Sequence, residues 1–193
     1  MSVRPQFYGR RTLIHDFITA DEQAHLVSWA LPLRPHLEDN GPGRTYAKVD
    51  ALPHAPPLYD AVQHRLATRL AIPLEALPEP IFGWYLSIIS EGGAVHSHID
   101  PAPAGARHLR CNLFLQLPHE GGLPLIMGTP IPVRERSLLA FFPSEERHAS
   151  QAVAGDRWRI ICSFGYQTPP DYVIPSPPGA APVRQPINSA ATS

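Results

Sequence analysis

The chain has 193 residues, of which 44% are hydrophobic, and its 16 basic and 17 acidic side chains leave a formal charge of −1. This length and composition allow one globular domain with a sizeable core, and the balanced charge argues against a broad surface for nucleic acid or an anionic membrane. The amino-terminal stretch lacks the apolar core of a signal peptide, and no stretch has the apolar run of a membrane span, so we expect a cytoplasmic protein. The two cysteines, Cys111 and Cys162, lie in apolar strand patterns and are expected to be reduced core residues.

Two helices are expected early in the chain. The segment Thr19-Ala-Asp-Glu22 has the form of a capping box, in which a hydroxyl and a carboxylate satisfy free backbone amides at a helix start. The residues that follow place apolar side chains on one face, and a second apolar stripe begins after two prolines. The sequence therefore predicts helices over residues 19–31 and 58–71.

From residue 81 onward the chain consists of short apolar runs separated by glycine and proline, which is typical of antiparallel sandwiches and barrels. We therefore predict a mainly β fold with flanking α-helices, and eight strands suit a jelly roll. The predicted strands cover residues 82–89, 94–100, 109–117, 123–127, 131–133, 138–142, 149–153 and 158–165.

A candidate metal site lies in the segment Gly92–Asp100. In an extended strand the side chains of His98 and Asp100 would project from the same face, close enough to share a cation. An imidazole with a carboxylate suits iron(II) better than a structural zinc ion, which usually takes thiolates or several imidazoles. The best candidate for a third ligand is His148, which lies near the start of a later strand.

The order of His98, Asp100, His148 about fifty residues later, and Arg157 nine positions further on resembles the iron(II)- and 2-oxoglutarate-dependent dioxygenases, most closely the prolyl-hydroxylase branch. The similarity covers roughly residues 82–166. It implies a double-stranded β-helix whose early helices pack outside the sheet. It also implies iron(II), 2-oxoglutarate and dioxygen as cofactor and cosubstrates, and hydroxylation as the reaction.

The same resemblance assigns His98, Asp100 and His148 as iron ligands and Arg157 as the cation that binds the far carboxylate of 2-oxoglutarate. A guanidinium suits that task because it donates two parallel charged hydrogen bonds. Arg159 has the same strand parity and is the alternative for this role.

Other residues are expected to border the pocket. Arg110, Asn112 and Gln116 share one face of a strand, and a polar inner face is costly unless it lines a site, although this face could instead meet solvent. Asn112 could contact 2-oxoglutarate or the substrate. His96 is either a pocket residue near the substrate or a surface histidine.

The chain departs from the family pattern at one position expected to contact 2-oxoglutarate. The family often has a tyrosine nine residues before its first iron-binding histidine, and here Ile89 holds that position. Tyr85 and Ser87 have the same strand parity and could take its place, which leaves the second contact to 2-oxoglutarate open.

Three other functions compete with the oxygenase. A non-catalytic, cupin-like metal-binding module would share the fold. A metallo-hydrolase motif would need a histidine at Pro101, and a nucleic-acid demethylase would need an arginine at Ser163. The substrate itself remains open among free amino acids, peptidyl residues and small natural products, and no nucleic acid or membrane partner is expected.

We expect residues 1–168 to form a single domain. Residues 169–193 are rich in proline and poor in charge, without a periodic apolar face, which predicts an irregular arm or tail. It could also cover the site as a lid.

Overall fold

The computed structural model describes residues 10–175. Two α-helices, α1 (Ala20–Ala30) and α2 (Pro57–Arg69), precede most of the strands, and two short 3₁₀ helices cover Leu31–His36 and Val49–Ala51. The strands of this part of the chain are β1 (Arg11–Ile14), β2 (Glu38–Asp39), β3 (Arg44–Lys48), β4 (Trp84–Ile89), β5 (Arg107–Gln116), β6 (Glu120–Gly121), β7 (Pro124–Ile126), β8 (Thr129–Pro130), β9 (Leu138–Phe141), β10 (His148–Ser150), β11 (Val153–Ala154) and β12 (Arg159–Thr168).

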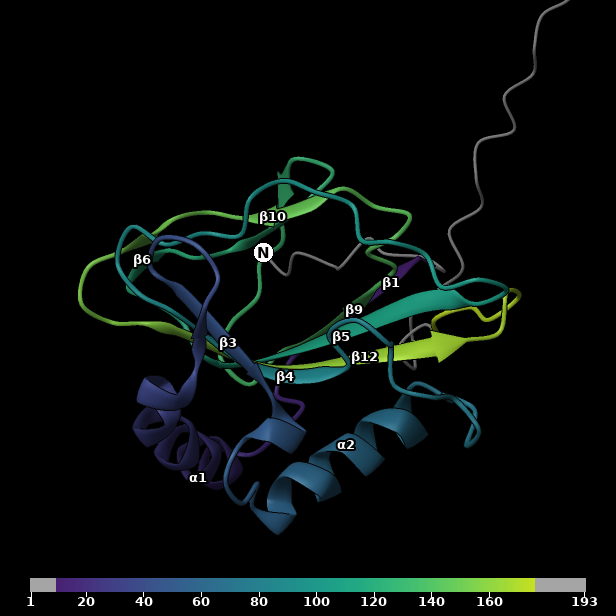
Figure 1. Cartoon of the computed structure of the whole chain (residues 1–193), viewed down its shortest axis with the longest axis horizontal. Helices are drawn as coiled ribbons and strands as arrows, with labels where there is room; N and C mark the ends of the chain where they lie inside the picture. The colour runs from purple at the N-terminus through teal and green to yellow at the C-terminus, as the bar shows by residue number, and fades with distance from the viewer. Residues whose placement is uncertain (1–9, 176–193) are drawn as a thin grey trace, which may run out of the picture.

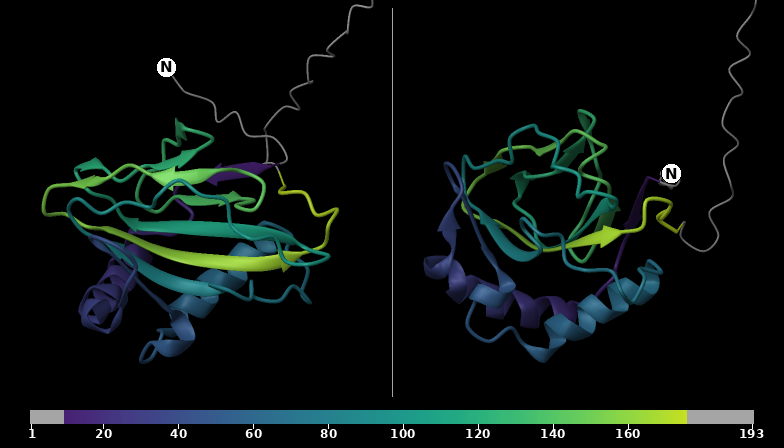
Figure 2. Two further views of the ribbon diagram at one scale, coloured as in Figure 1. Left: turned by 45° about the horizontal axis from the view of Figure 1, so that its top comes forward. Right: turned by 45° about the vertical axis from the view of Figure 1, so that its right-hand side comes forward.

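The strands form a large antiparallel sheet with the order β1-β9-β5-β12-β4-β3-β2, a three-stranded sheet β10-β7-β8, and the pair β11-β6 (Figure 1). Figure 2 shows the strands curving into an open barrel, with the small sheets opposite the large one. Side chains from both sides, including Phe114 of β5, Ile161 of β12 and Ile126 of β7, form one buried cluster. The predicted mainly β fold with a jelly-roll sheet is confirmed.

The two central strands β5 and β12 separate two environments. Their alternate residues Cys111, Leu113 and Cys162 are buried in the larger apolar cluster, which also contains residues of both helices. The residues of opposite parity, such as Arg110 and Asn112, point to the interior between the sheets, where they line a cavity. The polar face predicted on β5 therefore faces inward and not toward solvent.

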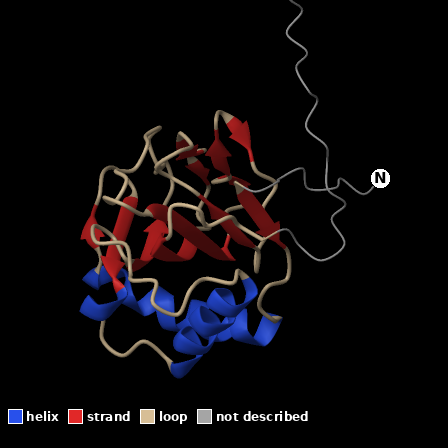
Figure 3. Ribbon diagram, turned by 90° about the vertical axis from the view of Figure 1, so that its right-hand side faces the viewer, coloured by secondary structure: helices blue, strands red, loops and turns tan. Residues whose placement is uncertain are grey.

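Both helices cover the outer face of the large sheet (Figure 3). The capping box of α1 is present as predicted, because the Thr19 hydroxyl accepts from the Glu22 amide and the Glu22 carboxylate accepts from the Thr19 amide. Leu26 and Leu66 are fully buried against the sheet.

Both cysteines are free and buried, as expected. Within residues 10–175 no helix is both long and apolar enough to cross a bilayer.

Two predicted strands are wrong. Residues 94–100 form an irregular segment that pairs with β10 through an isolated bridge at His98. Its hydrogen bonds to β10 join Val95 to Ser150 and His98 to His148, so the four residues 95–98 lie opposite the three residues 148–150, and a regular ladder cannot form. Residues 131–133 turn on themselves through a bond from the Val133 amide to the Ile131 carbonyl.

The sequence analysis missed the strands β1, β2 and β3. Strand β1 pairs with β9, and β2 and β3 form a hairpin that extends the large sheet beyond β4. This hairpin lies in the Gly- and Pro-containing loop between the helices, where turn residues obscure the strand pattern.

The first residues after β12 pack on the domain. The Tyr172 hydroxyl donates to the Leu70 carbonyl at 2.7 Å, Arg107 donates to the Tyr172 carbonyl, and Ile174 is buried. The remainder of the expected tail, residues 176–193, lies outside the described residues, as do residues 1–9.

Candidate metal centre

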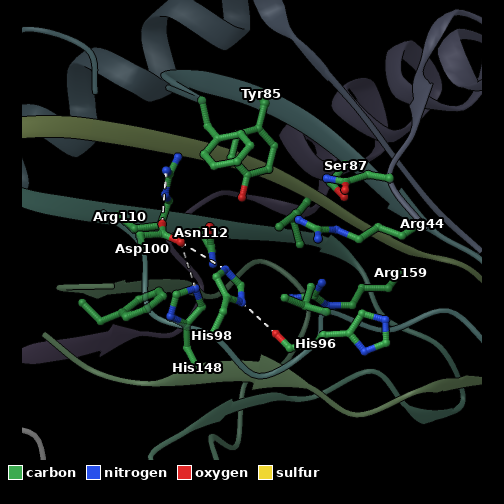
Figure 4. A pocket seen from close by; sticks show the side chains of 15 residues that line it. Arg44, Tyr85, Ser87, His96, His98, Asp100, Arg110, Asn112, His148 and Arg159 are labelled. Carbon is green, nitrogen blue, oxygen red and sulfur yellow. Dashed lines mark hydrogen bonds and ion pairs between the residues drawn. The ribbon is translucent and has the colours of Figure 1, made fainter. Parts of the chain in front are cut away.

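Two side chains of one segment meet a third, from about fifty residues later, in the interior between the sheets. One donor atom from each of His98, Asp100 and His148 lies within 4.8 Å of the other two. The Oδ1 atom of Asp100 is 3.0 Å from Nε2 of His98 and 3.7 Å from Nε2 of His148 (Figure 4). No other group of histidine, cysteine, aspartate and glutamate in residues 10–175 has this geometry.

The hydrogen bonds of the two histidines leave the same ring nitrogen available in each. Nδ1 of His98 lies 2.7 Å from the His96 carbonyl, and Nδ1 of His148 lies 3.1 Å from the Glu146 carbonyl. A carbonyl oxygen only accepts, so each Nδ1 carries a hydrogen and each Nε2 has a lone pair free for a cation. Such hydrogen bonds on the far side of the ring are the usual way in which proteins orient metal-binding histidines.

Backbone hydrogen bonds fix the three residues relative to one another. The amide of His98 donates to the His148 carbonyl at 3.0 Å, and the amide of His148 donates back at 2.9 Å. The Asp100 amide donates to the Pro143 carbonyl at 3.0 Å. The irregular segment of His98 and Asp100 is thus anchored at both ligand positions although it is not a strand.

The pKa shifts of the three clustered side chains are those expected of a site that binds a cation. Burial alone would raise the pKa of Asp100, but the hydrogen bond from His98 and the neighbouring His148 and Arg110 lower it below its ordinary value. Burial lowers the pKa of His148, whereas the hydrogen bond with Asp100 raises that of His98. The lowered pKa of Asp100 keeps this carboxylate ionised, and its negative charge favours a cation beside Nε2 of His98.

A buried group of charged residues lies behind Asp100. Arg110 is 3.2 Å from Glu79 and 3.8 Å from Asp100, and it also donates to the Gly83 carbonyl. Burial would raise the pKa of Glu79, but the amides of Phe82 and Ile81 and the charge of Arg110 lower it. Glu79 therefore compensates the buried guanidinium.

His108 completes this group. Burial, together with Arg110, lowers its pKa to about 4, so it is neutral at pH 7. Its Nδ1 atom lies 3.7 Å from Asp100. Neither Glu79 nor His108 could be predicted from a local pattern, because neither belongs to a spaced motif.

The three residues open onto a cavity of about 270 Å³. Its other polar lining comes from the β2–β3 hairpin, from β4, β5 and β12, and from the irregular segment: Asn40, Arg44, Tyr85, Ser87, His96, Arg110, Asn112 and Arg159. Asp100 is the sole acidic residue among the described residues that line it. The cavity is therefore rich in positive charge.

Of the two arginines predicted to bind 2-oxoglutarate, the structure places the alternative and not the favoured residue in the cavity. Arg157 lies outside the cavity, 2.5 Å from Glu135, and also donates to the Leu117 carbonyl. It occupies a bend before β12 begins at Arg159, and strand parity does not extend through a bend. Arg159, the alternative, lines the cavity and is only 3% exposed.

Arg159 is a buried cation without a hydrogen-bonding partner for two of its nitrogens. Its Nε and Nη1 atoms have no partner among the described residues, and its guanidinium lies over the Phe114 ring at 5.3 Å. Burial lowers its pKa to about 10, which still leaves it charged at pH 7. An unpaired buried charge is costly, so this arrangement suits the binding of an anion.

Of the remaining predicted residues, some line the cavity and Gln116 does not. Asn112, Tyr85 and His96 line the cavity, and the Ser163 hydroxyl donates to Oδ1 of Asn112 at 2.7 Å. Gln116 does not line it, and its amide instead donates to the Trp158 carbonyl. Gln116 has the right parity but lies beyond Phe114, at the far end of the strand.

The sequence analysis missed Arg44 and Asn40, both in the unpredicted β2–β3 hairpin. An arginine and an asparagine beside glycine and proline carry no signal by themselves, and their role depends on the hairpin joining the sheet.

Solved structures with a similar backbone are oxygenases and an epimerase. A viral collagen prolyl hydroxylase from Paramecium Bursaria Chlorella virus-1, in complex with 2-oxoglutarate, has a TM-score of 0.63 and 17% sequence identity over 83% of this chain and 96% of its own. HygX from Streptomyces hygroscopicus, with nickel and 2-oxoglutarate bound, has a TM-score of 0.61 and 14% identity over 85% and 84%. The non-heme alpha-ketoglutarate-dependent epimerase SnoN from nogalamycin biosynthesis has a TM-score of 0.60 and 18% identity over 83% and 78%.

The chain has the fold of the 2-oxoglutarate-dependent oxygenases. At these identities the likeness concerns the fold alone. No protein-family model matches the sequence, and no curated protein matches it.

The cluster predicts that the metal-free protein binds one divalent ion. We expect His98→Ala to weaken Co(II) binding by on the order of 100-fold, because it removes a direct ligand and not merely an outer hydrogen-bonding partner. The absorption of bound Co(II) measures the affinity. His96→Ala is the matched control, since His96 lines the same cavity outside the cluster. Equal affinity of the two variants would contradict the assignment.

The buried pair of Glu79 and Arg110 predicts a pH-dependent contribution to stability. Glu79→Gln is expected to lower the free energy of unfolding by about 3 kcal/mol at pH 7, because Arg110 loses its closest buried counter-charge. The pKa of Glu79 is lowered in the folded state, so this stabilisation is complete above its ordinary pKa of 4.5 and is lost as the pH falls further. Urea unfolding at pH 7 and pH 4 should show the gap between wild type and variant narrowing in acid. The exposed Glu75→Gln is the control, and an equal effect there would count against the pair.

Proposed function

We propose that the protein is an iron(II)- and 2-oxoglutarate-dependent oxygenase that hydroxylates a small-molecule or peptidyl substrate. The observation that carries the proposal is the presence, in one cavity, of a His-Asp-His cluster and of a buried arginine, Arg159, that has no counter-charge among residues 10–175. The first would hold the metal, and the second would hold the cosubstrate.

The donor set fits iron(II). Two imidazoles and one carboxylate with their donor atoms within 4.8 Å of one another match the arrangement typical of non-heme iron oxygenases, which leaves other coordination positions open. Three protein ligands with a carboxylate differ from the four ligands of a closed structural zinc site. His98, Asp100 and His148 are thus the proposed ligands.

The surroundings also fit 2-oxoglutarate. Its far carboxylate would meet the free Nε and Nη1 atoms of Arg159, which satisfies a guanidinium that is otherwise unpaired. Asn112, held by Ser163, and Tyr85 line the same cavity and would supply neutral hydrogen bonds to the cosubstrate. In this proposal Tyr85 takes the place of the tyrosine that is absent at Ile89.

Bound iron and 2-oxoglutarate would supply the oxidation of a substrate C–H bond by dioxygen, with one oxygen atom going to the new hydroxyl and the other to succinate, and with release of carbon dioxide. The protein's own residues orient the reactants. His96 and Glu146 fix the ligand rings through their carbonyls, and Arg159 fixes the cosubstrate. Arg110 lies 3.8 Å behind Asp100 and contributes a positive charge that lowers the pKa of this carboxylate.

The neighbours with this fold support the class and leave the outcome of the reaction to experiment. They include prolyl hydroxylases, HygX in complex with hygromycin B, and the epimerase SnoN. Hydroxylation is the simplest outcome for a site of this composition, and mass analysis of the product distinguishes it from epimerisation, which leaves the mass unchanged.

Substitutions of Arg159 and of the nearby Arg157 test the proposal. In the Ni(II)-loaded protein, Arg159→Gln is expected to weaken 2-oxoglutarate binding at least about 30-fold, since losing a buried charge pair costs about 2 kcal/mol or more. Arg157→Gln should bind 2-oxoglutarate like the wild type, because Arg157 pairs with Glu135 outside the cavity. Calorimetry measures both affinities.

When the same proteins are loaded with iron(II) in air, Arg157→Gln should form succinate like the wild type, and Arg159→Gln should form less. Tight 2-oxoglutarate binding without any succinate, whatever the candidate substrate, would favour a non-catalytic metal-binding module. The reverse order of the two arginines would overturn the proposed role of Arg159.

A further inference from the structure

A second arginine enters the cavity from the same side as Arg159. Arg44 of β3 is opposite Ile89 of β4, and Ile89 is opposite Arg159 of β12, so the three residues lie in one row across the sheet on the same face. Figure 4 shows the side chains of Arg44 and Arg159 both entering the cavity, across from Arg110. Burial lowers the pKa of Arg159, and the positive charge of Arg44 lowers it further.

Arg44 has no counter-charge within the described part of the chain. No ion pair and no side-chain hydrogen bond of Arg44 is found among residues 10–175, and its Nε atom is buried without a partner. Arg110, by contrast, is paired with Glu79 and lies near Asp100. The two unpaired guanidinium groups of the cavity are therefore those of Arg44 and Arg159.

In the proposed complex, one of these two guanidinium groups is left without an anion to balance its charge. A divalent metal with Asp100, the two carboxylates of 2-oxoglutarate and the guanidinium of Arg159 together carry no net charge, and Glu79 offsets Arg110. The positive charge of Arg44 remains after metal and cosubstrate are bound. In a cavity of low dielectric constant an unmatched charge favours a further anion.

Arg44 is held rigidly enough to select such an anion. The Gly43 carbonyl accepts from the Ser90 amide at 2.7 Å and from the Ser90 hydroxyl at 3.2 Å. A Cβ atom on Gly43 would lie 2.9 Å from Gly93, so the hairpin turn is packed against the start of the segment that carries His98. Preorganised groups lose less entropy on binding.

A neutral donor accompanies the charge. Asn40, at the other end of the same turn, also lines the cavity, and its backbone amide donates to the Arg44 carbonyl at 2.8 Å. Arg44 and Asn40 together offer a guanidinium and an amide to one oxyanion.

We propose that the substrate carries an oxyanion, a carboxylate or a phosphate, which binds Arg44 and Asn40 beside the metal centre. This inference rests on the proposed function and adds the substrate class. It assigns 2-oxoglutarate to Arg159 and the substrate to Arg44, so each of the two arginines binds a different anion.

The test follows the Nε–H resonance of each arginine by ¹⁵N NMR in protein loaded with Zn(II), which has no redox chemistry. Adding 2-oxoglutarate should shift the Arg159 resonance. In the resulting complex, acetate or methyl phosphate should then shift the Arg44 resonance, with at least about tenfold higher affinity than the exposed Arg69 shows. Whichever of the two anions binds more tightly identifies the charged group of the substrate as a carboxylate or a phosphate. Neutral acetamide should have no effect.

Variants separate the two arginines. Arg44→Gln should lose the Arg44 resonance and the tight acetate or methyl phosphate site, and Arg44→Lys should retain part of the affinity. 2-Oxoglutarate binding should weaken far less in Arg44→Gln than in Arg159→Gln, with Arg69→Gln as the surface control. An Arg44 resonance that responds no better than Arg69 would overturn the proposal. So would an Arg44→Gln variant that loses 2-oxoglutarate binding as Arg159→Gln does. If neither metal nor 2-oxoglutarate binds the wild type, it is the proposed function that fails.

Discussion

The structure of the site depends on two backbone hydrogen bonds between His98 and His148. They join an irregular segment to β10 and bring together side chains that are far apart in sequence. Beyond this bridge the Asp100 amide donates to the Pro143 carbonyl and not to β10, and this contact places Asp100 beside the two imidazoles. One bridge, and not an extended ladder, therefore sets the geometry of the cluster.

Around this bridge the protein separates its charges into two groups. Behind Asp100, Glu79 compensates Arg110, and neutral His108 fills the remaining space. In front of Asp100, Arg44 and Arg159 face the cavity, and the described part of the chain supplies neither with a counter-charge. The first group stabilises a buried carboxylate, whereas the second is most stable when anions occupy the cavity. The proposed cosubstrate and an anionic substrate would satisfy both arginines.

Local sequence patterns predicted those parts of the site that depend on spacing. The two-residue step from His98 to Asp100 and a later histidine near a strand start indicated the cluster, and alternation on β5 placed Arg110 and Asn112 inside. The patterns failed where geometry changes along an element. Arg157 has the parity of Arg159 but lies in the bend before β12, and Gln116 has the parity of Asn112 but lies too far along its strand.

The mainly β class and both helices, with a capping box on α1, could be predicted from the sequence because they follow from local periodicity and short-range hydrogen bonds. The three clustered residues were predicted from their order along the chain, through the resemblance to a known family, and not from local periodicity, since the strand expected at residues 94–100 does not form. The tertiary structure alone decided that Arg159 and Arg44 share one cavity and that Glu79 supports Arg110 from behind. Such arrangements depend on which strands become neighbours, and strand order is set by long-range packing that no local pattern records.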